Sequence, residues 1–170
     1  MFADRFTQIF REEHRAVRDT LLDLIVAIQE RDKARILSLL NQTAALTGPH
    51  FRYEEEALYP GLVEIFGEEY VEKLLCDHDQ AIGRANVLVG LAGKEQLTDE
   101  DVTKATRIIR SILPHVSDCD GLSIMVERLP ESKIRSVLEA RDRSHQAGLD
   151  LLRWASQVRN RPIAQISLAS

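Results

Sequence analysis

Apolar residues recur at helical spacing along most of the chain. In the first thirty residues the apolar stripe advances by three or four positions at each step, which predicts a helix over about residues 3–29 with one face turned to a core. Stripes of the same period predict helices over about 32–66, 68–92 and 98–129. A fifth helical segment is expected over about 132–158. The pattern therefore predicts an all-α protein.

Glycine, proline and capping residues mark the ends of these helices. Gly67 and Gly93 bound the third helix. Thr98 is followed by three acidic residues, a pattern typical of a helix N-terminus. Pro49 falls inside the second helix, where proline removes a backbone hydrogen bond, and we expect a bend just before His50.

Four long helices with short connections predict an up-down-up-down four-helix bundle with an additional C-terminal helix. The expected single domain covers residues 1–158, and residues 159–170 are expected to form a flexible tail. The C-terminal helix carries Trp154 and an apolar stripe beyond the needs of a four-helix core. We expect it either to close over the bundle as a lid or to present a surface to a second copy or another partner.

Composition limits the classes of partner. The formal net charge is −5, whereas nucleic-acid binding requires a basic face, so nucleic acid is not an expected partner. No run approaches the roughly 20 apolar residues of a membrane span, and the N-terminus lacks the apolar block of a signal peptide. The two cysteines fit a reducing compartment better than a disulfide framework. These features predict a cytoplasmic protein that does not bind membranes.

Histidine spacing is the most informative chemical feature of the chain. Four of the five histidines form two pairs of nearly equal span, 36 and 37 residues. In each pair an acidic residue precedes the first histidine and a proline precedes the second, so residues 6–66 and 68–129 are two copies of one pattern. All four lie on the inward stripes of predicted helices, which favours a metal site over four separate core histidines. The pairs are His14 with His50 and His78 with His115.

Further candidate ligands follow the second histidine of each pair. Residues four apart on a helix differ by about 40° around its axis, so Glu54 points into the same volume as His50. Cys119 has the same relation to His115. Imidazole and carboxylate together suit iron, manganese or zinc, and a thiolate favours zinc or iron.

The segment from His50 to Pro60, HFRYEEEALYP, closely resembles the signature of hemerythrin-like proteins, the HHE cation-binding domains, and the resemblance spans residues 6–129. It implies a four-helix bundle that holds a non-heme, usually di-iron centre. Matched residue by residue, it implies the metal ligands His14, His50, Glu54, His78 and His115, with Glu54 bridging two metals.

The second half departs from that family pattern. Cys119 stands where the family has glutamate. Asp120 and Asp118 are alternative ligands, although on a regular helix they lie about 140° and about 60° from His115, on opposite sides. Cys119 is equally well explained as a small buried apolar residue.

Other polar residues near the motif have simpler interpretations. Tyr53 and Tyr59 are expected mainly to pack in the core, with a hydrogen bond to a ligand or a redox role as the alternative. Glu55 and its neighbour Glu56 are expected on a solvated face, although Glu55 could assist Glu54. His145 is expected on the surface.

Three functions from different classes are compatible with these residues. The resemblance favours a non-heme iron protein, with two irons expected, that binds or senses a small diatomic molecule, oxygen or nitric oxide. The second is an iron-handling, iron-sulfur-repair or detoxifying role, with turnover of peroxide or nitric oxide; an enzyme is less expected than a binding protein. The third is a bundle that binds one metal ion or none and serves as a scaffold, which the replacement at Cys119 would explain.

Overall fold

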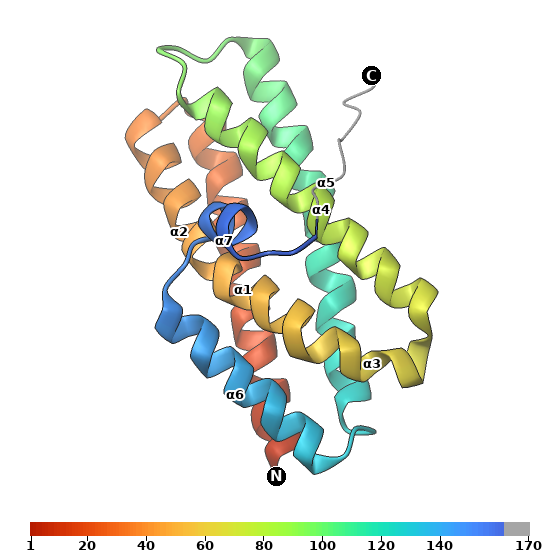
Figure 1. The fold of residues 1–170 in the computed structure, drawn as a ribbon. Coiled ribbons are helices and arrows are strands. Elements are labelled where there is room, and N and C mark those ends of the chain that lie inside the picture. The colour runs from red at the N-terminus through yellow and green to blue at the C-terminus, as the bar shows by residue number, and fades with distance from the viewer. Residues whose placement is uncertain (162–170) are drawn as a thin grey trace.

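The structure is a computed structural model that describes residues 1–161. Helices account for the described fold, as the apolar periodicity predicted (Figure 1). The elements are α1 (Phe2–Gln29), α2 (Lys33–Tyr53), the π-helical turn η1 (Glu54–Leu58), α3 (Tyr59–Phe66), α4 (Glu68–Ala92), α5 (Asp99–Val126), α6 (Glu131–Ala147) and α7 (Leu151–Gln157).

Four long segments form the predicted bundle. Helix α1 packs between α2 and α5, and α4 contacts both α5 and α2, which closes the ring. Helix α6 lies against α1 and α2, whereas α7 lies across the middle of the bundle against α2 and α4 (Figure 1). Trp154 of α7 is buried with Phe51 of α2 and Ile82 of α4, so this helix covers the bundle.

The second predicted helix is interrupted by a π-helical turn. Helix α2 continues through Pro49 to Tyr53, and regular α-helical geometry is lost only at Glu54–Leu58. Pro60 follows in the first turn of α3, where its missing N–H costs no helical hydrogen bond. π-Helical turns inside helices often mark functional sites, because they change the direction of successive side chains.

The fifth predicted helix is two helices. Gly148 ends α6 in the left-handed conformation, with φ of 61°, which favours glycine. Asp150 then caps α7 by accepting a hydrogen bond from the Arg153 N–H. Both signals are present in the sequence, but Leu138 and Leu149 are eleven residues apart, close to three helical turns, so periodicity alone predicted one helix.

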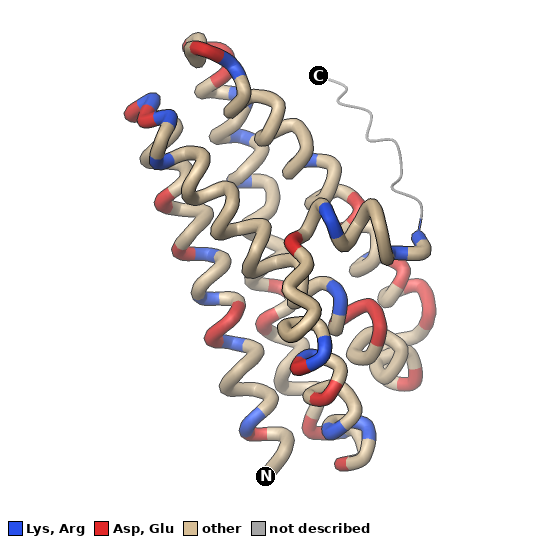
Figure 2. The backbone as a smooth tube through the Cα atoms, turned by 60° about the vertical axis from the view of Figure 1, so that its left-hand side comes forward, with Lys and Arg blue, Asp and Glu red and all other residues tan. Residues whose placement is uncertain are grey.

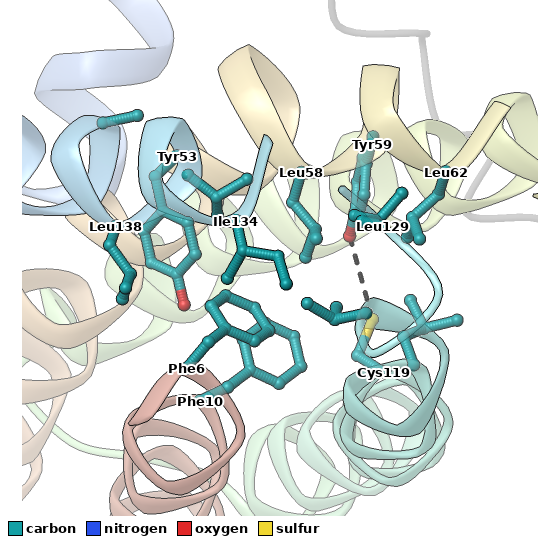
Figure 3. Close-up of a cluster of buried hydrophobic side chains, with 14 of the residues drawn as sticks. Phe6, Phe10, Tyr53, Leu58, Tyr59, Leu62, Cys119, Leu129, Ile134 and Leu138 are labelled. Carbon is teal, nitrogen blue, oxygen red and sulfur yellow. Dashed lines mark hydrogen bonds between the residues drawn. The ribbon is translucent and has the colours of Figure 1, made fainter. Parts of the chain in front are cut away.

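Apolar side chains form two large clusters at opposite ends of the bundle. Phe6 and Phe10 belong to the first cluster, with Tyr53, Tyr59 and Cys119 (Figure 3). The second contains the apolar positions of α1 from Val17 onward and those of α5 up to Val116. His14 lies on α1 between Phe10 and Val17, so the histidines occupy the layer between the clusters.

Charged residues lie mostly on the outside of the helices. Figure 2 shows acidic and basic positions interspersed along them. Within the described residues, no helix is both long and apolar enough to cross a membrane.

The segment after α7 returns to the bundle. Arg159, at the start of the predicted tail, has a side chain only 1% exposed, and Arg161 contacts Glu72 and Asp79. Charge pairing with acidic residues of η1 and α4 explains this packing. The rest of the predicted tail, 162–170, lies outside the described residues.

Candidate metal centre

Four helices each bring one histidine to the middle of the bundle. His14 and His50 lie with their rings 4.6 Å apart and nearly perpendicular, at 86°. His78 and His115 repeat this arrangement at 5.1 Å and 80°. The duplicated sequence pattern thus produces two similar pairs of imidazoles, one from each half of the chain.

Glu54 lies between the two pairs and is fully buried. Its Oε1 is 3.5 Å from His50 Nε2, and its Oε2 is 3.2 Å from His78 Nε2. Among the residues that the structure describes, neither carboxylate oxygen has a hydrogen-bond partner, and neither does His50 Nε2. Burying such groups without partners is costly, and a bound cation would satisfy all three atoms. The residues present therefore fit a metal.

The outward nitrogen of each histidine faces an oxygen atom. Donation from Nδ1–H to oxygen fixes the ring and leaves Nε2 free to bind a metal, as in most metal-binding histidines. The Nδ1 partners are the Phe10 carbonyl for His14 at 2.8 Å, Glu13 for His50 at 2.7 Å, Glu55 for His78 at 2.9 Å and Asp77 for His115 at 3.5 Å.

Sequence reasoning missed the role of these carboxylates, although the signal was present. Glu13 and Asp77 are the acidic residues directly before the first histidine of each pair, and each contacts the second histidine of its own pair. Adjacent residues on a helix point about 100° apart, so the acidic residue faces the neighbouring helix. Glu55 is also mostly covered rather than on a solvated face, with its side chain 10% exposed, because its carboxylate accepts a hydrogen bond from His78 and pairs with Arg159.

The three alternative ligands of the second half lie in different environments. Cys119 is fully buried, and its Sγ is 3.5 Å from His115 Nε2. His14, Glu54 and Cys119 have ligand atoms within 4.8 Å of one another. Asp118 is exposed. Asp120 is half-buried: its Oδ2 lies 3.5 Å from Arg11, and its Oδ1 is buried without a hydrogen-bond partner among the described residues. The geometry brings Cys119 to the cluster and leaves Asp118 outside it.

Both tyrosines of the motif make polar contacts as well as packing in the core. The Tyr53 hydroxyl donates to Glu13 at 2.8 Å. The Tyr59 hydroxyl lies 3.0 Å from His78 Nε2 and 3.7 Å from Cys119 Sγ (Figure 3). Tyr59 thus places an oxygen atom at the centre itself. His145, expected on the surface, is partly exposed and lies 3.2 Å from Glu13.

Buried charges shift the proton affinities of these groups. Burial lowers the pKa of His50, but the Glu54 and Glu13 carboxylates outweigh it and raise this pKa to about 10. Burial and the nearby His50 charge lower the pKa of His14 to about 4. Burial and the Glu54 charge raise the pKa of the Cys119 thiol well above its usual value. A metal would have to displace protons from both His50 and Cys119.

These shifts predict a stability maximum near pH 6.5 for the metal-free protein. Folded His14 takes its proton only near pH 4, so stability should rise with pH from 4 to 6.5. Folded His50 keeps its proton up to about pH 10, so stability should fall from pH 6.5 to 10. Each group contributes a slope of at most about 1.4 kcal/mol per pH unit. Urea denaturation between pH 4 and 10 measures the free energy of unfolding. A free energy that rises steadily through pH 9 would contradict the raised pKa of His50.

A family comparison agrees with this arrangement. The family model described as the hemerythrin HHE cation binding domain matches residues 5–122 of the chain. The chain belongs to the hemerythrin family. The matched hemerythrin region contains the four histidines, Glu54 and Cys119, and it ends before α6 and α7. No curated protein and no solved structure gives a significant match.

Membership in the hemerythrin family makes the protein a helical member of a cation-binding family, as the resemblance in the sequence predicted. The buried cluster of histidine, glutamate and cysteine is the candidate site for that cation. Helices α6 and α7 add a layer to the hemerythrin bundle from outside the matched region.

Proposed function

We propose that the centre holds two iron ions and that the protein binds or senses a small diatomic molecule, oxygen or nitric oxide. The observation that carries this proposal is the position of Glu54, whose two oxygens face histidines of different pairs. A carboxylate between two imidazole pairs is a suitable bridge for two cations.

The chain offers donors for both positions. His14 and His50 would hold one ion, His78 and His115 the other, and Glu54 both. Cys119 is a further buried donor. Asp118 is exposed, whereas Asp120 pairs with Arg11 through Oδ2 and has a buried Oδ1 without a hydrogen-bond partner among the described residues, which makes it an alternative donor. Imidazole and carboxylate donors favour iron, with zinc or manganese as alternatives.

Iron bound here would supply a redox-active ion with room for an exchangeable ligand. The residues of the chain hold the rings in place, since each histidine faces an oxygen through Nδ1. They also exclude bulk water, because Glu54 and His78 are fully buried. A low-dielectric site of this kind favours a small uncharged ligand over an anion.

A cavity of about 70 Å³ supports a diatomic ligand. It adjoins His14, His50, Glu54 and His115 at one end and is otherwise lined mostly by apolar side chains of α1, α2, α4 and α5. Leu151 and Leu152 of α7 close one side. One water needs roughly 10–15 Å³, so the space is sufficient for a diatomic molecule beside the ions.

The test is to load the metal-free protein with ferrous iron without oxygen and then add nitric oxide or oxygen. Saturable, reversible binding with a change in the iron spectrum is the expected result. Rapid consumption of nitric oxide or peroxide would instead favour the detoxifying enzyme. A protein that binds iron but neither gas would contradict the diatomic proposal.

Filling the cavity should slow ligand entry. Ala85 lines the cavity from α4, and Ala85→Leu adds three carbons to that space. Association of nitric oxide is expected to slow several-fold with iron content unchanged, measured by stopped-flow absorbance. Ala45→Leu, the same change at an exposed position of α2, should leave the rate unchanged. Equal rates in both variants would mean that ligands enter by another route.

Cys119 is expected to ligate iron as a thiolate. The sulfur then adds a sulfur-to-iron charge-transfer absorption, which should disappear from the iron-loaded Cys119→Ser protein. The serine variant keeps the side-chain volume almost unchanged at this fully buried position. An identical spectrum in the two proteins would assign Cys119 to core packing alone.

A further inference from the structure

We propose that Arg141 and Arg159, which lie beyond the region shared with the hemerythrin family, position two of the metal-binding histidines. Each arginine binds a carboxylate that in turn accepts the Nδ1–H of a histidine, Glu13 for His50 and Glu55 for His78. The inference rests on the metal centre proposed above. It means that residues of the C-terminal segment hold two histidines of that centre in place.

Arg159 forms the more buried of the two contacts. Its Nε and Nη2 lie 2.9 and 2.8 Å from the two oxygens of Glu55, and its Nη1 lies 2.7 Å from Asp79. Glu55 Oε1 accepts the His78 Nδ1–H at 2.9 Å. A two-pronged guanidinium contact fixes the plane of a carboxylate, which a single ammonium group cannot do. Arg159 thereby restrains the acceptor that orients His78.

Arg141 repeats this arrangement on the other half of the site. Its Nε donates to Glu13 Oε1 at 2.6 Å. The second oxygen of Glu13 accepts hydrogen bonds from His50 at 2.7 Å and from Tyr53 at 2.8 Å. Both oxygens of the carboxylate are therefore occupied, so it cannot turn without breaking a charged hydrogen bond.

The other two histidines lack such support, and this difference is informative. Asp77, the partner of His115, is more exposed, lies 3.5 Å away and has no arginine contact within the described residues. His14 donates to a backbone carbonyl, which needs no support. The two supported histidines are those whose Nε2 atoms face the oxygens of Glu54. Support is thus concentrated on the histidines beside the proposed bridge.

The fold of the C-terminal segment holds Arg159 in this position. Trp154 packs on Phe51, and the Phe51 ring stacks on His78 at 3.7 Å with the planes 4° apart. The backbone before α7 passes directly over Gly48 of α2. Helix α7, which ends two residues before Arg159, is therefore anchored to the helix that carries His50 and to the ring of His78.

Cobalt(II) binding to the metal-free protein tests the proposal. Loss of a group that orients a metal-binding histidine typically weakens metal binding about 10- to 100-fold, so Arg159→Gln and Arg141→Gln should each weaken it about tenfold. The matched control is Arg161→Gln, since Arg161 contacts Glu72 and Asp79 but no carboxylate that binds a histidine. It should bind cobalt as the unmodified protein does.

A double-mutant cycle separates positioning from general stability. In a Glu55→Gln background, Arg159→Gln should cause no further loss of cobalt affinity, because the carboxylate through which Arg159 acts on His78 is already absent. Arg159→Lys keeps the charge without the two-pronged contact and should give an intermediate affinity, which preserves the test if Arg159→Gln does not fold. Independent, additive losses would overturn the proposal.

A readout without metal distinguishes this inference from the proposed metal centre. The Nδ1 proton of His78 should exchange with water at least about tenfold faster in Arg159→Gln than in Arg161→Gln, measured by proton NMR of the metal-free proteins. Unchanged exchange in Arg159→Gln would overturn the positioning role. If no variant binds cobalt and the unmodified protein does not bind it either, the metal centre is rejected. The exchange measurement still decides the role of Arg159 in that case.

Discussion

Replacing Glu54 with glutamine is expected to weaken iron binding by at least about 100-fold. This loss is larger than the loss expected when a residue that only orients a ligand is replaced. The carboxylate is fully buried, and both of its oxygens face histidine nitrogens without a hydrogen-bond partner within residues 1–161. Glutamine keeps the shape but removes the charge that two cations would share, and it turns an N–H₂ group toward one histidine. Titration of the metal-free protein with ferrous iron measures the loss, and His50→Ala should likewise remove most of the bound metal.

The matched control for this prediction lies two residues away. Glu56 belongs to the same π-helical turn, but its side chain is 46% exposed and pairs with Arg52 on the surface. Glu56→Gln should leave iron affinity unchanged. Equal iron affinity in Glu54→Gln and Glu56→Gln would remove Glu54 from the site.

Replacing Gly48 with alanine is expected to destabilise the protein by about 2 kcal/mol, within the range typical of overpacked cores. An added Cβ would lie 2.7 Å from the Leu151 N and closer still to the Leu149 carbonyl oxygen. Both contacts are with backbone, so no side chain can turn away to relieve them. For a chain of this size the melting temperature should fall by about 4–8 °C.

Gly90 provides the opposite case on a neighbouring helix. It lies in α4, is exposed, and has no atom of the described part of the chain within 4 Å of the position of an added Cβ. Gly90→Ala should therefore stabilise the protein by roughly 0.5–1 kcal/mol, because alanine loses less conformational entropy in a helix. Thermal unfolding of both variants tests the close approach of the backbone before α7 to Gly48. A lower melting temperature in both variants, or in neither, would contradict it.

The sequence predicted what depends on local periodicity. Four bundle helices, the layer of histidines and the pairing of His50 with Glu54 all follow from spacings of three or four residues along one helix. The acidic residues before His14 and His78 belong to the repeated pattern in the sequence. Their contacts with the second histidine of each pair required knowing which helices are neighbours.

The parts that escaped prediction depend on contacts distant in sequence or on departures from regular helix. Glu55 and Arg159 are 104 residues apart, so no window of the chain brings them together. In the π-helical turn Glu54 is fully buried and the Glu55 side chain is only 10% exposed, whereas a regular helix period predicted one inward and one solvated carboxylate. The break at Gly148 was missed because Leu149 lies close to three helical turns after Leu138, which is compatible with one continuous helix.

The most direct test of a two-iron centre is the number of metal ions per chain in protein purified without a metal-binding tag and measured by elemental analysis. The position of Glu54 between two histidine pairs predicts two irons per chain. One metal ion or none would contradict the two-iron centre and would mean that the second half of the site, with Cys119 in place of glutamate, no longer holds its own ion.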